Sequence, residues 1–382
     1  MSEYQYYEFQ AIDRPLTDKE QGILRGYSGR AAITATRFVN SYSYGNFKGD
    51  ESQWMEKYFD AFLYMANWGT HRLMLRLPTS LLPMKVARRY CAGDMLSARA
   101  AGRRLILDIR PEDEEGDGDW IEDDNDMLSS LLPVRADLAG GDLRALYIAW
   151  LGGAQAGEFD DEEEEPPCPP GLGKLSEALE AFADFLRVDH DLIDAAATAS
   201  PDLAAIENGT LRRWVSELSE EQRTDLLARL IGGVETHLQS QVLKQIRESC
   251  VSEAPVARTK ARTVGELLEA GEGQAEDRCR QECKREAREK ARREREEAAE
   301  RELRLNVLAK REEEAWRQLD GLIATKHPKK YDEAIVLLRD LRDLCARTGR
   351  QAEAMARIAR LREEHGNKPS FIKRIRVAGL GP

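Results

Sequence analysis

An acidic segment at residues 113–124, DEEGDGDWIEDD, contains the residues best suited to chemistry in this sequence. Aligned with the calcium loop of a helix–loop–helix site, it has carboxylates at loop positions 1, 3, 5, 7 and 12. These carboxylates belong to Asp113, Glu115, Asp117, Asp119 and Asp124. Calcium binds about six to eight hard oxygen ligands, which clustered carboxylates supply. The spacing therefore predicts a divalent-cation site.

Three features of the same segment argue against a calcium site. Asp124 is shorter than the bidentate glutamate that usually closes such a loop. Trp120 stands where a small aliphatic residue is usual, and a strand instead of a helix is predicted to precede the loop. The alternative is a disordered acidic loop, to which a basic partner could bind. The disordered acidic loop is the favoured interpretation, and the cation site is the less favoured one.

Two cysteines and five histidines are the other candidates for metal or redox chemistry. Cys279 and Cys283 lie one helical turn apart, a spacing that could present two thiolates to a metal or an oxidant. No second pair of cysteines or histidines with zinc spacing follows them. The histidines, at positions 71, 190, 237, 327 and 365, lie far apart and outside nucleophile and zincin motifs. We therefore expect no catalytic residue and no cofactor.

Aromatic and basic residues near the N-terminus form a candidate surface for nucleic acid. They are Tyr4, Tyr6, Tyr7, Tyr42 and Tyr44, with Arg30, Arg37 and Lys48 nearby in the sequence. Bases stack on exposed aromatic side chains of this kind. Tyrosines in strands more often pack in a core or against a neighbouring strand, and this alternative is favoured.

Length, charge and cysteine use narrow the class of protein. The chain has 382 residues, of which 33% are charged, and a formal net charge of −12. Ten acids lie at residues 112–126 and seven at residues 158–165, so the negative charge is concentrated in two segments. Six scattered cysteines indicate a reducing compartment. Because the chain shows neither a signal-peptide pattern nor an apolar run of membrane-spanning length, we predict a cytoplasmic protein with no membrane segment.

A charged stretch at residues 276–314 organises the rest of the chain. Glutamate, arginine, lysine and alanine dominate it, and neither glycine nor proline interrupts residues 276–318. Pairs such as Glu286–Lys290 and Glu297–Arg301 place an acid one turn before a base, which stabilises a helix by about 0.2–0.5 kcal/mol per pair. We predict one long helix of roughly 60 Å.

Three roles are open to this helix. It could be a lone solvated spacer, it could pack on a partner through a thin stripe of small residues, or it could bind nucleic acid through its arginines. The stripe consists of Cys279, Cys283, Ala287 and Ala291. Acids and bases are equal in number across residues 276–314, so a phosphate backbone would feel little net charge. The spacer role is therefore favoured.

The N-terminal part alternates strand-like and helix-like segments. Strands are predicted at residues 4–12, 32–44, 71–77 and 104–110. A capping box opens a short helix at Thr17. Apolar residues at helical spacing predict a helix over residues 54–66, which Gly69 ends. Further helices are predicted at residues 127–138 and 142–151.

The segment EAWRQLDGLIATKHPKKYDEAIVLLRDL near the C-terminus resembles a tetratricopeptide repeat. It departs from the family at Asp320, where a small glycine is usual, and in a longer turn between its two helices. A second, weaker unit, GRQAEAMARIARL, follows it. The resemblance implies protein–protein contact, and so few repeats imply a docking cap instead of a peptide-binding groove. The interaction residues it implies are Trp316, Leu319, Ile323, Tyr331, Ile335 and Leu338.

These patterns together predict an α+β fold class that is mostly α. The run DDEEEEPPCPPGLG disfavours both helix and strand, because prolines lack N–H donors and the acids repel each other, so it marks a domain boundary. The expected divisions are an α/β domain at residues 1–157, an acidic and proline-rich linker at 158–174, an all-helical module at 175–250, a linker at 251–275, the charged spacer helix at 276–314 and a tetratricopeptide-like helical unit at 315–382.

The opening YQYYEFQAIDRPLT and the later RFVNSYSYGNFKGD resemble a widespread family of uncharacterised bacterial proteins. That resemblance covers most of the chain and implies no activity and no functional residues. We therefore expect a non-enzymatic intracellular adaptor, with a protein partner bound by the C-terminal unit. The alternative is an accessory subunit of a nucleic-acid-processing complex that uses the tyrosine and arginine surface. An enzyme with an unrecognised pocket in the first domain is a third class.

Overall fold

The computed structural model describes residues 3–111, 127–203, 208–232, 237–251 and 262–380. The chain divides into two compact units, Met1–Arg278 and Cys279–Pro382. The first unit contains an antiparallel sheet with helices, and the described part of the second unit is helical. The predicted mixed fold class, with helix in excess of strand, is therefore confirmed at this coarse level.

The sheet of the first unit has seven antiparallel strands in the order β2-β3-β1-β4-β5-β7-β6. The strands are β1 (Gln5–Gln10), β2 (Ala32–Ile33), β3 (Arg37–Tyr42), β4 (Ala61–Ala66), β5 (His71–Pro78), β6 (Leu96–Ala101) and β7 (Arg104–Ile109). The N-terminal strand β1 lies near the centre, paired with β3 on one side and β4 on the other.

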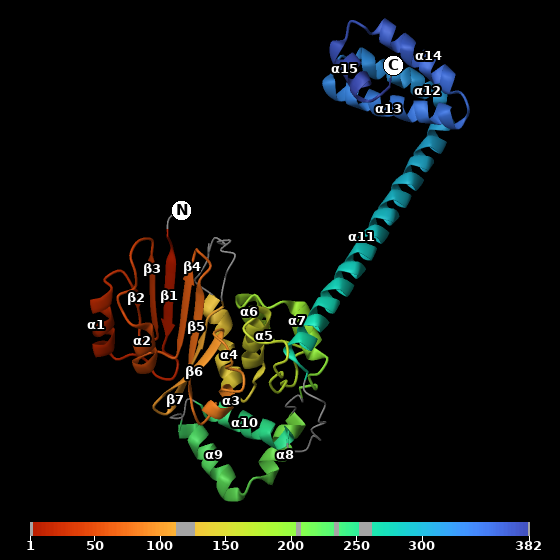
Figure 1. Cartoon of the computed structure of the whole chain (residues 1–382). Coiled ribbons are helices and arrows are strands. Elements are labelled where there is room, and N and C mark those ends of the chain that lie inside the picture. Colours follow the sequence, from red (N-terminus) through yellow and green to blue (C-terminus); the bar gives the residue numbers. More distant parts are fainter. Residues whose placement is uncertain (1–2, 112–126, 204–207, 233–236, 252–261, 381–382) are drawn as a thin grey trace. The chain divides into compact units, whose positions relative to one another are not determined.

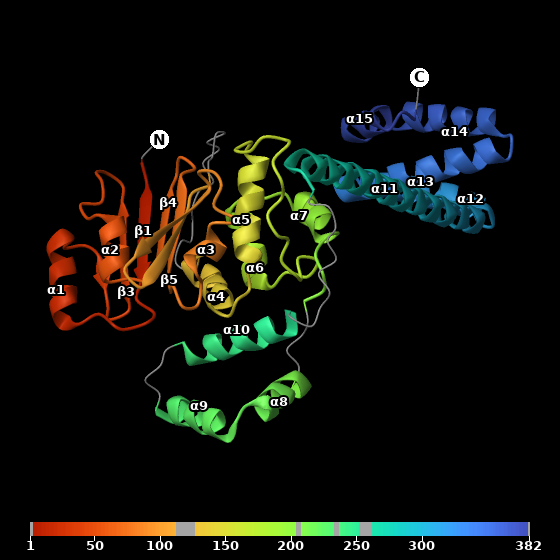
Figure 2. The same cartoon turned by 60° about the horizontal axis from the view of Figure 1, so that its bottom comes forward.

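Both faces of this sheet are apolar, and helices lie on each side (Figures 1 and 2). The helices concerned are α1 (Asp18–Tyr27), α2 (Glu51–Lys57), α4 (Met127–Ala139) and α5 (Arg144–Gln155). Phe9 and Phe62 on one face pack in the same cluster as Trp54 of α2. On the opposite face Leu63 and Leu75 belong to the cluster that contains α4 and α5. Side-chain alternation along each strand therefore supplies two separate cores.

The predicted helix at residues 54–66 is wrong. Helix α2 ends at Lys57, and the chain then enters β4 at Ala61. Phe62 and Leu63 are adjacent in the strand and both fully buried, because both faces of the sheet are covered. Such a strand does not alternate between apolar and polar residues. Read together with the apolar residues of α2, its own apolar residues recur at the spacing of a helix, which led to the wrong prediction. Gly69 has φ +94° and lies between β4 and β5 instead of ending a helix.

Two further differences concern short strands. The predicted strand at residues 32–44 is two strands, β2 and β3, which pair with each other. Strand β6 was not predicted, because its sequence LSARAA is rich in alanine and has a weak strand signal. The predicted strands at β1, β5 and β7, the capping box at Thr17 and the helices α4 and α5 are confirmed.

The described part of the first unit also contains the start of α11 (Val264–Ala309) and six more helices: α3 (Met84–Ala87), α6 (Glu177–Phe185), α7 (His190–Ala197), α8 (Asn208–Glu217), α9 (Glu220–Gly232) and α10 (Leu238–Val251). One hydrophobic cluster extends from the sheet through α4–α7 to Leu267. The segment predicted as a linker at residues 158–174 lies against this body. Glu158 accepts hydrogen bonds from the N–H groups of Asp94 and Met95, both at 2.9 Å, and Arg262 pairs with Glu165 at 2.8 Å. The predicted sixfold division of the chain stays a prediction.

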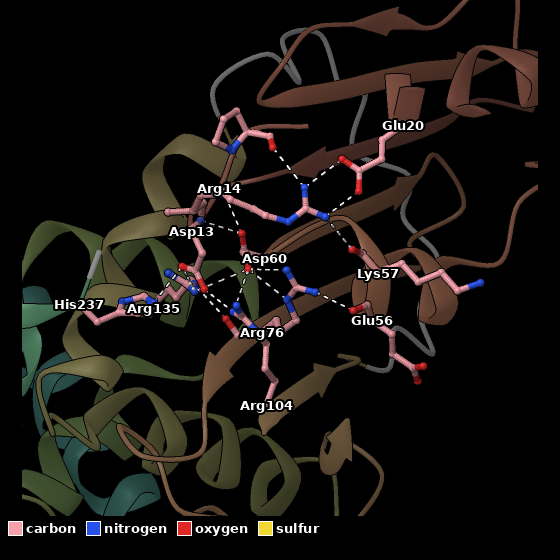
Figure 3. A network of polar contacts seen from close by, with 12 residues as sticks. Asp13, Arg14, Glu20, Glu56, Lys57, Asp60, Arg76, Arg104, Arg135 and His237 are labelled. Atoms are coloured by element: carbon pink, nitrogen blue, oxygen red, sulfur yellow. Dashed lines mark hydrogen bonds and ion pairs between the residues drawn. The ribbon is translucent and has the colours of Figure 1, made fainter. Parts of the chain in front are cut away.

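A buried aspartate fixes one end of the sheet (Figure 3). Asp60 is fully buried and accepts hydrogen bonds from the N–H groups of Ile12 at 2.7 Å and Asp13 at 2.8 Å. It also pairs with Arg76, whose Nη2 lies 2.8 Å from Asp60 Oδ1. Arg76 donates a further hydrogen bond to the carbonyl of Glu56, at 2.8 Å. The Asp60–Arg76 pair therefore connects four elements: β5, α2, the end of β1 and the start of β4.

A second aspartate, Asp13, connects this end of the sheet to the helices, and its side chain is only 5% exposed. Asp13 pairs with Arg135 of α4 at 2.7 Å, with Arg104 of β7, and with His237 at 3.1 Å (Figure 3). Burial by itself raises the pKa of the Asp13 carboxyl. The hydrogen bond with His237 and the contacts with Arg135 and Arg104 outweigh burial, so this pKa lies well below its ordinary value.

The second unit has its own core. Its helices are the end of α11 (Val264–Ala309), then α12 (Glu312–Ala324), α13 (Pro328–Arg347), α14 (Gln351–Glu364) and α15 (Pro369–Val377). The charged stretch is helical as predicted, and every residue at 276–304 is exposed. The helix ends at Ala309, before the predicted end at residue 314, because a turn brings Trp316 into the same core as Leu308. Within the described ranges, no helix is both long and apolar enough to cross a membrane.

Replacement of Asp60 by asparagine should destabilise the first unit. The variant leaves the buried Arg76 guanidinium without its counter-charge, so we expect the free energy of unfolding to fall by about 3–5 kcal/mol in urea denaturation. The matched control is Asp184→Asn, because Asp184 is 69% exposed in its pair with His190. That pair should contribute about 0–1 kcal/mol. Equal losses in the two variants would contradict the structural role of Asp60.

The lowered pKa of Asp13 predicts a pH dependence of stability. A carboxyl whose folded-state pKa is lowered stabilises the protein above its unfolded pKa, near 4, and this contribution is lost as the pH falls towards the folded value. The free energy of unfolding should therefore fall more steeply below about pH 4 in the natural chain than in Asp13→Asn. Urea titrations at several acidic pH values measure the two slopes, and equal slopes would exclude a contribution from Asp13.

Candidate functional site

A pocket of about 840 Å³ opens beside α2 on the face of the sheet that carries Tyr7. It lies towards the end of the strands opposite to Asp60, because Tyr7 pairs with Tyr64 while Gln10 pairs with Ala61. The lining residues are Tyr7, Glu51, Phe62, Tyr64, Thr70, His71, Arg72, Asp94, Ser97, Arg110 and Pro111. They come from five strands or strand ends and from the first turn of α2.

Strand register explains why these residues meet. Tyr64 lies opposite Arg72 in the β4–β5 pair. Leu73 lies opposite Ile109 in the β5–β7 pair, so Arg72 and Arg110 are cross-strand neighbours. These side chains share one face of the sheet because the side-chain period of a strand is two.

Asp108 holds the two arginines of the pocket in place. Its carboxylate accepts from Nε and Nη2 of Arg72 at 2.8 and 2.7 Å, and from the same two groups of Arg110 at 3.2 and 2.7 Å. Burial raises the pKa of Asp108, but the hydrogen bonds from both arginines outweigh it and the pKa is lowered. The carboxylate is therefore ionised at neutral pH, and both guanidinium groups have defined orientations.

Two tyrosines form the aromatic wall of the pocket. The rings of Tyr7 and Tyr64 are 4.7 Å apart between centroids. Their hydroxyl groups both donate to Oε1 of Gln5, at 2.8 and 3.3 Å. Burial raises the pKa of both phenols. They therefore stay protonated at neutral pH and serve as packing and hydrogen-bonding groups, not as bases.

Charged side chains of both signs line the pocket, which suits it to binding. Glu51 Oε2 lies 3.6 Å from Nη1 of Arg72. His71 stacks on Phe185, with 5.7 Å between the ring centroids. Among the residues that the structure describes, no cluster of three or more histidine, cysteine, aspartate or glutamate residues could hold a metal ion.

The residues predicted to do metal or redox chemistry do not form this pocket. The acidic segment with Asp113, Glu115, Asp117, Asp119 and Asp124 lies outside the described residues, so the cation site there stays a prediction. Cys279 and Cys283 are exposed on α11. The neighbouring Cys279 raises the pKa of Cys283, which opposes thiolate formation at neutral pH.

The histidines and the N-terminal tyrosines lie at separate places. Of the histidines, His71 lines the pocket, His190 pairs with Asp184, His237 pairs with Asp13, His327 precedes α13 and His365 packs near Phe371. The tyrosines divide between the two faces of the sheet. Tyr4 and Tyr6 belong to the cluster with α4, whereas Tyr7 and Tyr42 belong to the cluster with α2, and Tyr44 is 84% exposed. The five tyrosines therefore do not form one stacking surface.

The six predicted interaction residues lie together in the core of the second unit. Trp316, Leu319, Ile323, Tyr331, Ile335 and Leu338 all belong to one buried cluster of α12 and α13, and none is more than 8% exposed. They pack the helices against one another. A partner that binds this unit would therefore contact other residues, and the interaction role of these six stays a prediction.

The sequence interpretation missed Arg72, Asp108 and Arg110. Their signal was present in the predicted strands, where Asp108 and Arg110 interrupt the apolar run LILDIR at alternate positions. Charged residues at alternate positions of an otherwise buried strand indicate a polar patch on one sheet face. The pairing of β5 with β7, which the sequence does not show, was needed to place Arg72 beside them.

Comparison of the chain with protein-family models, curated proteins and solved structures finds no match. The two family resemblances in the sequence therefore stay predictions. The pocket is defined by its geometry alone.

The core position of Leu338 predicts a large effect on stability. Leu338→Ala should lower the free energy of unfolding of the second unit by about 2–5 kcal/mol, because it leaves a cavity at a fully buried position. The neighbouring Val336 is 52% exposed, so Val336→Ala should cost less than about 1 kcal/mol. Thermal denaturation followed by circular dichroism compares the two variants. Equal effects would show that Leu338 is not a core residue.

Proposed function

We propose that the protein is a non-enzymatic intracellular interaction protein whose C-terminal unit binds a protein partner. The observation that carries the proposal is a helical core, formed from Leu305 onwards, that follows a fully exposed helical stretch at residues 276–304. A helix whose whole circumference is in solvent gains no packing energy from its own chain. Such a segment suits a connector better than part of a catalytic body.

The surface of the C-terminal unit offers binding groups that its core does not use. Val336 of α13 is 52% exposed and Val377 of α15 is 79% exposed. Arg357 of α14 lies over the ring of Trp316, 5.0 Å from its centroid, and pairs with Glu313 at 2.9 Å. These contacts keep the helices together, so the unit can present a rigid face to a partner.

The nucleic-acid alternative has less support. A stacking surface needs several aromatic rings on one face, and the N-terminal tyrosines divide between two faces. Arg37, one of the basic residues nearby, is paired with the buried Glu8 at 2.6 Å. This arrangement offers fewer unpaired cations to a phosphate backbone than the sequence alone indicated.

The test is capture of partners by the full chain and by two variants at one core position. Leu338→Asp buries a charge and should unfold the C-terminal unit, whereas Leu338→Met conserves volume and should leave it folded. We expect a defined protein partner, identified by mass spectrometry, to bind the natural chain and Leu338→Met and to be lost from Leu338→Asp. Circular dichroism of the three proteins verifies the folding difference.

Two results would overturn the proposal. In one, the same partner remains bound to Leu338→Asp, which would move the interaction to the first unit. In the other, the natural chain retards single-stranded or duplex nucleic acid at physiological salt and captures no protein partner. That outcome would favour the accessory subunit of a nucleic-acid-processing complex.

A further inference from the structure

We propose that the pocket beside α2 binds a small zwitterion of the amino-acid class. Arg110 and Arg72 would bind the ligand carboxylate, and Glu51 would bind its ammonium group. The proposal concerns the first unit and does not depend on the partner of the C-terminal unit. It describes binding and involves no covalent step.

The arginines are arranged to bind a carboxylate. Both use their Nε and Nη2 groups to contact Asp108, whereas Nη1 of Arg72 lies 3.6 Å from Oε2 of Glu51. The side chain of Arg110 is 57% exposed and that of Arg72 is 17% exposed, so solvent and ligands reach Arg110 more easily. Because Asp108 already fixes both guanidinium planes, binding costs little side-chain entropy.

The acids of the pocket select against simple anions and for a zwitterion. Glu51 and Asp94 line the same pocket as the two arginines, and Asp108 contacts both guanidinium groups. A polyanion would meet repulsion from both carboxylates, and a simple cation would meet repulsion from both guanidinium groups. A ligand with one positive and one negative end satisfies both pairs of groups. Free amino acids and peptide ends have this charge distribution.

The aromatic wall supplies a place for the ligand side chain. Tyr64 lines the pocket and is only half-buried, whereas Phe62, two residues before it on β4, is fully buried. The hydrogen bond from Tyr64 to Gln5 keeps the phenol at a fixed position. An apolar or aromatic side chain of the ligand would therefore pack against the Tyr64 ring.

Isothermal titration calorimetry on the full chain tests the proposal. The probes are L-phenylalanine, L-leucine, L-arginine and L-glutamate, with 3-phenylpropionate and 2-phenylethylamine as analogues of phenylalanine that each lack one charge. We expect at least one amino acid to bind saturably. If that amino acid is phenylalanine, each analogue should bind at least about tenfold more weakly, because each lacks one charge-assisted contact. If a different amino acid binds, its amide, which lacks the carboxylate, and its deaminated acid, which lacks the ammonium group, serve as the two analogues.

Two variants and a matched control locate the site. Arg110→Gln and Glu51→Gln should each weaken binding of that amino acid by about tenfold or more. Arg103→Gln is the control, because Arg103 is an exposed arginine between β6 and β7 that does not line the pocket. The Arg103→Gln variant should bind the amino acid with the same affinity as the natural chain. Circular dichroism verifies that all three variants remain folded.

Three results with the amino acids, their analogues and the variants would overturn the proposal. They are the absence of saturable binding for every amino acid tested, equal affinity for the amino acid and its carboxylate-only analogue, and unchanged affinity in both Arg110→Gln and Glu51→Gln. Tighter binding of inorganic phosphate than of any amino acid would likewise show a simple anion site.

Discussion

Two carboxylates at one end of the sheet, Asp60 and Asp13, with side chains that solvent hardly reaches, connect strands of the first unit to α2 and α4. An ion removed from water is tolerated only when opposite charges and hydrogen bonds surround it. Asp60 satisfies this condition with Arg76 and with two N–H groups of the chain that leaves β1. Asp13 satisfies it with Arg104, Arg135 and His237. These partners come from β5, β7, α4 and the residue before α10, so the positions of these elements are fixed by the same two charges (Figure 3).

The same strands carry the pocket at their other end. β5 contributes Arg76 to the buried network and Arg72 to the pocket, one at each end of the strand. Helix α2 is held in a similar way, since the carbonyl of Glu56 accepts from Arg76 and Glu51 in its first turn lines the pocket. The buried contacts of Asp60 and Asp13 therefore help to position the strands and the helix that form the pocket, although these aspartates do not line it. Asp108 repeats on a smaller scale what Asp60 does, because one carboxylate again orients guanidinium groups from neighbouring strands.

Elements that depend on a few neighbouring residues were predicted correctly from the sequence. Elements that depend on packing between distant parts of the chain were not. The capping box of α1 and the apolar runs of β5 and β7 depend on a few neighbouring residues, and their elements were placed correctly. The run at residues 54–66 was assigned to helix because burial of β4 on both faces removes its alternation, and burial is a property of the whole sheet. The pocket was missed for a related reason, since Arg72 and Arg110 become neighbours only through the β5–β7 pairing. Trp316 and Leu338 were predicted as interaction residues, and the structure places both in the core of the second unit.

The exposed stretch of α11, residues 276–304, should be the part of this helix whose backbone opens most easily. Every residue at 276–304 is exposed, so the helical hydrogen bonds of this stretch are supported mainly by intrinsic propensity and by local charge pairs such as Arg292–Glu296, with Arg278–Asp191 and Arg301–Asp343 as pairs to other helices near its two ends. Local opening of such a segment has a small free energy and needs no unfolding of either unit. Amide hydrogens in the stretch should therefore exchange with solvent much faster than those of the sheet. Its many arginines would meet trypsin in these brief openings, which makes this stretch the natural site of limited proteolysis.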